Sequence, residues 1–126
     1  MGQRSKTSGV AAVVRDRVVV TDAALATIIG LAAHEVPGVV GMAPASIREG
    51  LNRMLGTSRA DEGVDVERHE GEENRASIAL HVVVAYGVNI PVVAESVRER
   101  VRYAAQAYAG VEVDEVKVHI AGVSRG

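Results

Sequence analysis

Residues 76–121 of the chain read ASIALHVVVAYGVNIPVVAESVRERVRYAAQAYAGVEVDEVKVHIA, and this stretch decides the fold. Apolar side chains alternate with a period of two, typical of a strand, at both of its ends: Ile78, Leu80, Val82, Val84 and Tyr86, and later Val116, Val118 and Ile120. The middle has a helical period. The stretch therefore predicts a β-α-β unit, with a right-handed crossover if its two strands are parallel.

The helix predicted over residues 90–109 carries one apolar stripe. At about 100° per residue, seven side chains fall within an arc of roughly 100°, the width of a stripe that packs on a core. They are Ile90, Val93, Ala94, Val97, Val101, Ala104 and Tyr108. Asn89 is suited to cap the amino end, Pro91 to occupy the first turn, and Gly110 to end the helix. Because valine is a poor helix former, we expect packing on a sheet to stabilise this helix.

The closing strand has a break in its pattern. Val111 and Val113 are out of phase with the later valines, which predicts a bulge or bend near Asp114 and Glu115.

The amino-terminal half predicts a second helix after a strand. Residues 10–14 and, more clearly, 17–20 have strand character, and Thr21 with Asp22 supplies a helix cap. One face of this helix is apolar, and the opposite face holds His34, Thr27 and Gly30. The apolar face consists of Leu25, Ile28, Ile29, Ala32 and Val36.

Short strands are predicted at residues 39–42 and 64–67, and an acidic hairpin loop at residues 69–74. The order of elements predicts an α/β (α+β) two-layer sandwich, in which a mixed β-sheet carries two main helices on one face and a short variable helix. We expect a disordered tail at residues 1–9, a single domain over residues 10–123, and a short tail at residues 124–126.

Two stretches are candidate interaction surfaces. The short helix within residues 43–62 has an apolar face of Ile47, Leu51, Met54 and Leu55, too short to be stable alone in water. It must dock on its own domain, contact a partner or lie on a membrane surface. The second candidate is a small patch on the outer side of the long helix, formed by Val92, Ser96 and Tyr103, with the tyrosine as a candidate interface anchor.

Composition weakens the case for several classes of function. Aromatic residues make up 2% of the chain, so it lacks platforms for stacking sugars or bases, and a net charge of −2 gives no general attraction to nucleic acid. There is no cysteine, which suits the cytoplasm. No apolar run reaches the length of a membrane span, and the amino terminus has no signal sequence.

No catalytic or cofactor-binding motif is present, so we predict a protein that is not an enzyme, with no cofactor and no metal. His81 and His119 lie mid-strand in segments that could be neighbours, but no third metal ligand is evident. Gly38 to Gly41 matches the Gly-x-x-Gly of the KH nucleic-acid module, although its two middle residues are valines in a strand-like segment.

The pattern resembles the alkaline shock protein family, the general or envelope stress proteins of Gram-positive bacteria. Three segments carry the resemblance: VAYGVNIP at residues 84–91, VKVHIAGV at residues 116–123, and VPGV at residues 36–39. The likeness covers residues 17–123. The chain differs from longer members of that family by short tails and an arginine-containing insertion at residues 43–62.

The resemblance implies a non-enzymatic stress-response protein that supports cell-envelope homeostasis. It implies a cytoplasmic protein that self-associates, has no membrane span of its own, and is held peripherally at the inner face of the cell membrane by a membrane-anchored partner protein. The alternative left open is a small nucleic-acid-binding α/β (KH-like) module, suggested by Gly38 to Gly41 and the nearby arginines. An enzyme is the third possibility.

Overall fold

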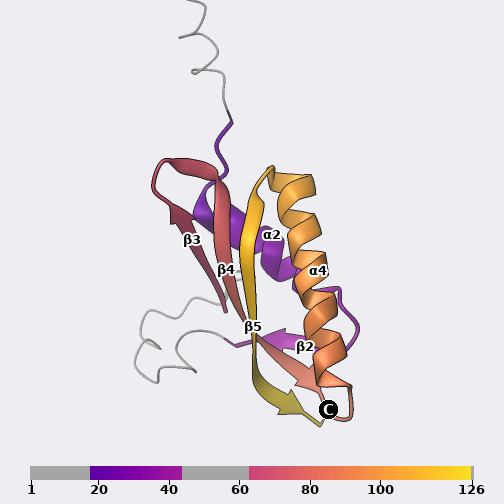
Figure 1. The fold of residues 1–126 in the computed structure, drawn as a ribbon. Helices are drawn as coiled ribbons and strands as arrows, with labels where there is room; N and C mark the ends of the chain where they lie inside the picture. Colours follow the sequence, from indigo (N-terminus) through magenta and orange to yellow (C-terminus); the bar gives the residue numbers. More distant parts are fainter. Residues whose placement is uncertain (1–17, 44–62, 126) are drawn as a thin grey trace, which may run out of the picture.

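The computed structural model describes residues 18–43 and 63–125. In chain order they form α2 (Asp22–His34), β2 (Val39–Met42), β3 (Val64–His69), β4 (Glu72–Ala85), α4 (Ile90–Ala109) and β5 (Glu112–Ser124) (Figure 1). The strand predicted at residues 10–14 and the short helix with Ile47, Leu51, Met54 and Leu55 lie outside the described residues.

The sheet is organised around β4. β5 pairs with β4 in parallel, whereas β3 and β2 pair with it antiparallel. Ile78 pairs with both Val66 of β3 and Val116 of β5, so β3 and β5 lie on opposite sides of β4. The same reasoning places β2 on the side of β3. The predicted mixed sheet and β-α-β unit are therefore confirmed, and the two strands of that unit pair directly.

β2 and β3 meet end to end beside His81 of β4. The amide of Ala43 donates to the carbonyl oxygen of His81 at 2.8 Å, and the amide of His81 donates to the carbonyl oxygen of Gly63 at 2.9 Å. The described residues on either side of positions 44–62 therefore lie at one point of the sheet. Residues 44–62 are inserted there between two strands that share one side of β4.

Both described helices cover the same face of the sheet, as predicted, and the hydrophobic core lies between the two layers (Figure 1). The inward side chains of β4 are almost fully buried: Ala76, Ile78, Leu80, Val82 and Val84. Tyr86, predicted to continue this face, lies one residue beyond the end of β4 and is 67% exposed. Its ring contacts the guanidinium of Arg125 instead, 4.9 Å from the ring centroid.

α4 has the predicted bounds and caps. The side chain of Asn89 accepts a hydrogen bond from the amide of Val92 at 3.2 Å, and Gly110 ends the helix in the left-handed conformation with φ 69°. The buried stripe is correct in the first four turns, where Val93, Val97, Val101 and Ala104 are buried.

The carboxyl end of the stripe was predicted wrongly. Tyr108 is 69% exposed, and Ala105 is fully buried, with Ala109 half-buried. The buried side chains of α4 follow every fourth residue, which rotates the buried face by about 40° per step along the helix. Alanine then lies against the core in the last turns, and the tyrosine turns outward. Ile90, at the other end of the stripe, is also partly exposed.

α2 is capped by Thr21, whose hydroxyl oxygen accepts from the amide of Ala24 at 3.1 Å, as predicted. Leu25, Ile29 and Val36 are buried. Gly30, predicted to be on the outer face, is buried. The reason is that α2 contacts α4 as well as β2 and β3, so a wider arc of this helix is covered than a sheet alone would cover.

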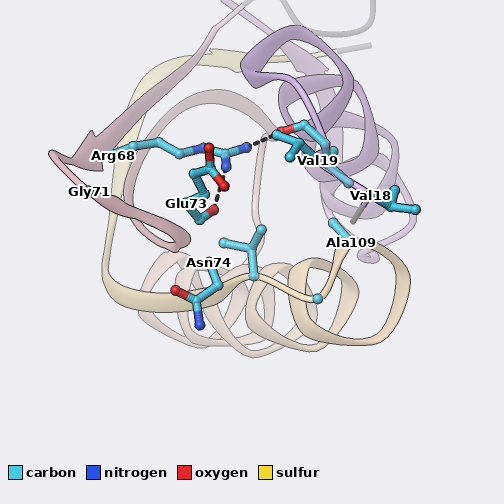
Figure 2. Close-up of a pocket in the computed structure, with 10 residues that line it drawn as sticks. Val18, Val19, Arg68, Gly71, Glu73, Asn74 and Ala109 are labelled. Carbon is cyan, nitrogen blue, oxygen red and sulfur yellow. Dashed lines mark hydrogen bonds between the residues drawn. The ribbon is translucent and has the colours of Figure 1, made fainter. Parts of the chain in front are cut away.

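The segment before α2 is not the predicted strand, since residues 18–20 pair with no other strand in the described part of the chain. A side chain holds it instead (Figure 2). Arg68 donates to the carbonyl oxygen of Val20 at 2.6 Å and to that of Glu73. Its Nε lies 2.9 Å from Asp22 Oδ1, a charge contact without hydrogen-bond alignment. This arginine joins the start of α2 to the β3–β4 hairpin.

The hairpin itself is tighter than the predicted loop, because only Glu70 and Gly71 separate β3 from β4. In β5, the predicted bulge is present: Val113 pairs with Ala76 and Glu115 with Ser77, which leaves Asp114 as the extra residue. A second irregularity, at Ala121 between Ile120 and Gly122, was not predicted.

Candidate interaction surface

The outer face of the sheet carries a histidine pair. His81 and His119 occupy paired positions on β4 and β5, and their rings stack with centroids 4.6 Å apart and planes 8° from parallel. His81 Nε2 lies 3.3 Å from Asp65 Oδ2. The neighbouring positions expected from the sequence are thus confirmed. Within residues 18–43 and 63–125, no group of three or more ligand residues is arranged to hold a metal ion.

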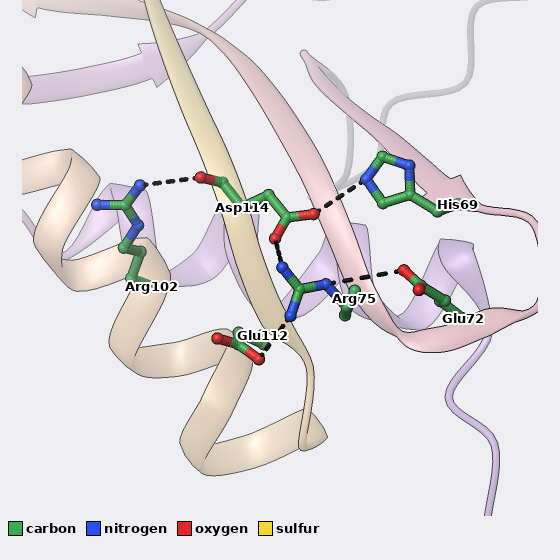
Figure 3. Close-up of polar contacts among 6 residues, drawn as sticks. All are labelled: His69, Glu72, Arg75, Arg102, Glu112 and Asp114. Atoms are coloured by element: carbon green, nitrogen blue, oxygen red, sulfur yellow. Dashed lines mark hydrogen bonds and ion pairs between the residues drawn. The ribbon is translucent and has the colours of Figure 1, made fainter.

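A charged cluster surrounds the bulge of β5 (Figure 3). The carboxylate of Asp114 contacts His69 Nε2 at 2.9 Å and the guanidinium of Arg75, which also reaches Glu112 at 3.1 Å. Arg102 of α4 donates to the carbonyl oxygen of Asp114 at 3.5 Å. These contacts join the hairpin, the bulge and the helix. The cluster therefore stabilises the backbone around the extra residue of the bulge.

The residues of the predicted patch on α4 differ in exposure. Val92 and Tyr103 are exposed, at 58% and 61%, and Ser96 is half-buried. Tyr103 meets Tyr108 edge to face, with ring centroids 6.2 Å apart. The exposed tyrosine is therefore one half of an aromatic pair, which the sequence did not predict.

This aromatic pair borders a groove between α2 and α4 of about 310 Å³. The groove is lined by Ile28, Leu31, Ala32, Glu35, Arg100, Tyr103, Ala104 and Tyr108. Leu31 is 55% exposed, and the rim carries an ion pair between Glu35 Oε1 and Arg100 Nη1 at 2.9 Å. We call these eight residues, together with Val92 and Ser96, the helix-layer surface. It combines an apolar floor, two exposed aromatic rings and one charge of each sign.

The sequence predicted the α4 side of the helix-layer surface but not the α2 side. Leu31 and Tyr108 lie on different helices, and the period of one helix does not indicate which face of another helix it contacts. Glu35 and Arg100 are 65 positions apart, so no local spacing signals their contact. The second set of predicted contact residues, Ile47, Leu51, Met54 and Leu55, lies outside the described residues, so that prediction remains untested.

The Gly-x-x-Gly segment does not form the loop that a KH module needs. Gly38 is a turn residue with φ 101°, and residues 39–42 form β2, which pairs with β4. A KH loop connects two helices and places its backbone against phosphates. Here the same residues lie in the sheet.

The family model that matches the sequence covers residues 9–125 and describes the alkaline shock protein family, with a cell envelope-related function. The chain belongs to the alkaline shock protein family. This confirms the resemblance found in the sequence and, at the level of the family description, the link to the cell envelope. No helix in the described part of the chain has the length and apolar character required to cross a membrane.

Three relatives of this chain come from two Gram-positive bacteria. The uncharacterized protein YloU of Bacillus subtilis is 34% identical over 105 residues, which cover 82% of this chain and 85% of the relative. The uncharacterized protein Spy1614 of Streptococcus pyogenes is 31% identical over 104 residues, covering 82% and 84%. The uncharacterized protein YqhY of Bacillus subtilis is 32% identical over 96 residues, covering 76% and 68%. No solved structure matches the chain.

Proposed function

We propose that this protein is a non-enzymatic stress-response member of the alkaline shock protein family that supports cell-envelope homeostasis by self-association and protein contacts at the cytoplasmic side of the membrane. Family membership supports the envelope role. The helix-layer surface supports a mode of action through protein contacts. In this proposal a membrane-anchored partner holds the self-associated protein at the inner face of the membrane.

The observation that carries the proposal is the aromatic pair beside the α2–α4 groove. Tyrosine is enriched among residues that contribute most to protein interfaces, and it contributes most when it fills a pocket surrounded by other apolar groups. Tyr103 and Tyr108 stand beside a groove with Leu31 in its lining. The surface thus has both exposed aromatic rings and a groove lined by apolar side chains.

A second copy of the chain suits this surface. A two-fold contact places the same patch of both subunits face to face, so the patch must complement itself. In such a dimer, the tyrosine rings of one copy pack into the groove of the other. The ion pair of Glu35 with Arg100 supplies opposite charges at the rim, and a two-fold axis can bring each charge next to its opposite on the partner.

The test compares two exposed tyrosines. Tyr103→Ala is expected to lower the molar mass in sedimentation equilibrium and to reduce recovery with the membrane fraction after cross-linking. Its thermal stability should change little because the ring is mostly exposed. Tyr86→Ala, at the far end of β4, removes a comparably exposed ring and should leave both measurements unchanged. Equal masses for wild type and Tyr103→Ala would exclude this surface as the contact.

Nucleic-acid binding, the alternative function, is tested by a separate measurement. Phosphate contacts weaken steeply with salt, so a gel-shift titration with RNA and DNA at two salt concentrations detects them. We expect no salt-dependent shift. A strong shift that disappears at high salt would favour nucleic-acid binding over the proposed contacts.

A further inference from the structure

The outer edge of β5 is a second surface that can take a partner. β5 is 13 residues long, and among the strands in the described part of the chain it pairs with β4 alone. The edge of a sheet presents backbone donors and acceptors that a further strand can pair with. Proteins commonly protect such an edge with charged side chains, bulges or a covering element.

The amino half of the β5 edge is protected in this way. Arg102 donates to the carbonyl oxygen of Asp114 at 3.5 Å, and Arg98 donates to that of Val116 at 3.4 Å (Figure 3 shows the first). The bulge at Asp114 and its ion pairs lie in the same half. Here the helix layer reaches over the strand and occupies its outward carbonyl groups.

The carboxyl half has a different character. Residues 118–124 read VHIAGVS and contain no aspartate, glutamate, lysine, arginine or proline. Because the backbone groups of a strand alternate in direction, Val118 and Ile120 direct theirs to the same side as Val116, away from β4. After the second bulge, the even-numbered residues point toward β4 instead: the carbonyl oxygen of Ser124 accepts from the amide of Tyr86 at 2.7 Å.

We propose that a second copy of this chain pairs with this edge, β5 against β5 in antiparallel direction, with His119 of the two copies facing each other at a two-fold axis. The amide and carbonyl groups of Val118 in one copy then pair with those of Ile120 in the other. A strand that pairs with itself in antiparallel direction gives a closed two-fold dimer. This inference rests on the proposed self-association and adds a contact separate from the helix-layer surface.

The charges along β5 agree with this register. With His119 opposite itself, Lys117 faces Ala121 of the other copy. The second bulge shifts the register beyond Ala121, and Glu115 there meets only the uncharged residues 122–124. Like charges directly opposite each other in a sheet are destabilising, and this arrangement opposes none. A parallel arrangement in register would instead place every charged residue of β5 opposite or beside its own copy. Charge therefore favours a second copy in the antiparallel direction.

The absence of cysteine from the chain makes the test specific. In antiparallel strands, facing residues at a non-hydrogen-bonded position have Cα atoms about 4.5 Å apart, which a disulfide can span. His119→Cys is therefore expected to form a disulfide-linked dimer under mild oxidation. Lys117→Cys should not, because its two copies are about four residues apart along the paired strands, on the order of 13 Å. Glu67→Cys is the second control, because Glu67 lies on β3, which is separated from β5 by β4.

Hydrogen exchange provides a measurement without substitution. The amides of Val118 and Ile120 should exchange more slowly as the protein concentration rises, because pairing protects them. Equal disulfide yields for the three cysteine variants, or exchange independent of concentration, would overturn the proposal. Protection without a His119→Cys disulfide would mean another strand or another register and would also overturn it. If Tyr103→Ala dissociates the protein while these tests are negative, the proposed function stands and the edge contact fails.

Discussion

A β-carbon on Gly63 would lie 2.8 Å from the carbonyl oxygen of Ala43. Gly63 directly precedes β3 and Ala43 directly follows β2, and both residues bond to the backbone of His81. Gly63 also has φ 83°, a conformation that residues with a side chain rarely adopt. Close approach of the two strand ends thus depends on a residue without a side chain.

We therefore expect Gly63→Ala to lower the free energy of unfolding by about 1–3 kcal/mol, from backbone strain and the clash with Ala43. Urea denaturation followed by circular dichroism measures this. Gly71→Ala is the matched control: Gly71 has φ 80°, but no atom lies within 4 Å of a β-carbon added there, so it carries the strain without the clash. Equal losses for the two variants would mean that the contact with Ala43 has no cost.

The core face of α4 is tested by Val97→Asp. Val97 is fully buried against the sheet, and an aspartate there would place an unpaired charge in the core. We expect a loss of about 5 kcal/mol or more, as large as the whole free energy of unfolding of a marginally stable domain, so that the variant does not fold. Gln106→Asp puts the same carboxylate on the exposed face of α4 and should fold normally. A folded Val97→Asp protein, judged by thermal denaturation, would show that this face of the helix is not core.

The role of Arg68 is tested by Arg68→Met. The substitution removes the bonds to the carbonyl oxygens of Val20 and Glu73 but keeps most of the apolar stem. We expect the free energy of unfolding to fall by about 1–3 kcal/mol, since hydrogen bonds from charged groups are among the stronger ones. Faster amide exchange at the start of α2 should accompany the loss. Arg125→Met, at an exposed position near the chain end, should change neither measurement.

Residues 44–62 connect two strand ends that meet at His81. We expect a variant in which a short glycine–serine turn replaces them to keep the fold, because a shorter connection costs less closure entropy and the bonds of Ala43 and Gly63 remain. Thermal denaturation measures the outcome. A glycine–serine replacement of the original length is the control for lost side chains. Collapse of both variants would mean that Ile47, Leu51, Met54 and Leu55 belong to the core. Retained stability with reduced self-association would support their predicted role as contact residues.

Local features were predictable from the sequence because they depend on neighbours in the chain. The bounds of α4 follow from its periodicity together with Asn89 and Gly110, which satisfy the backbone groups at its two ends. The bulge at Asp114 follows from a change of phase between valines on either side. Both conclusions use only residues that are close together in the chain. Family membership, too, follows from the order of residues alone, since the family model matches residues 9–125.

Contacts between distant segments were decided only by the tertiary structure. The sequence predicted a strand at residues 17–20 from its valines, but in the described part of that segment the backbone is held by Arg68, 48 positions beyond Val20. The helical wheel places Tyr108 on the core face, but the side chain is exposed. The core is instead covered by Ala105, because the buried face of α4 rotates along the helix where α4 packs against α2 and the sheet. Periodicity states which side chains share a face, whereas burial depends on where another element crosses that face. For this reason the stripe on α4 was visible in the sequence, and the α2–α4 groove and the exposed tyrosine pair were not.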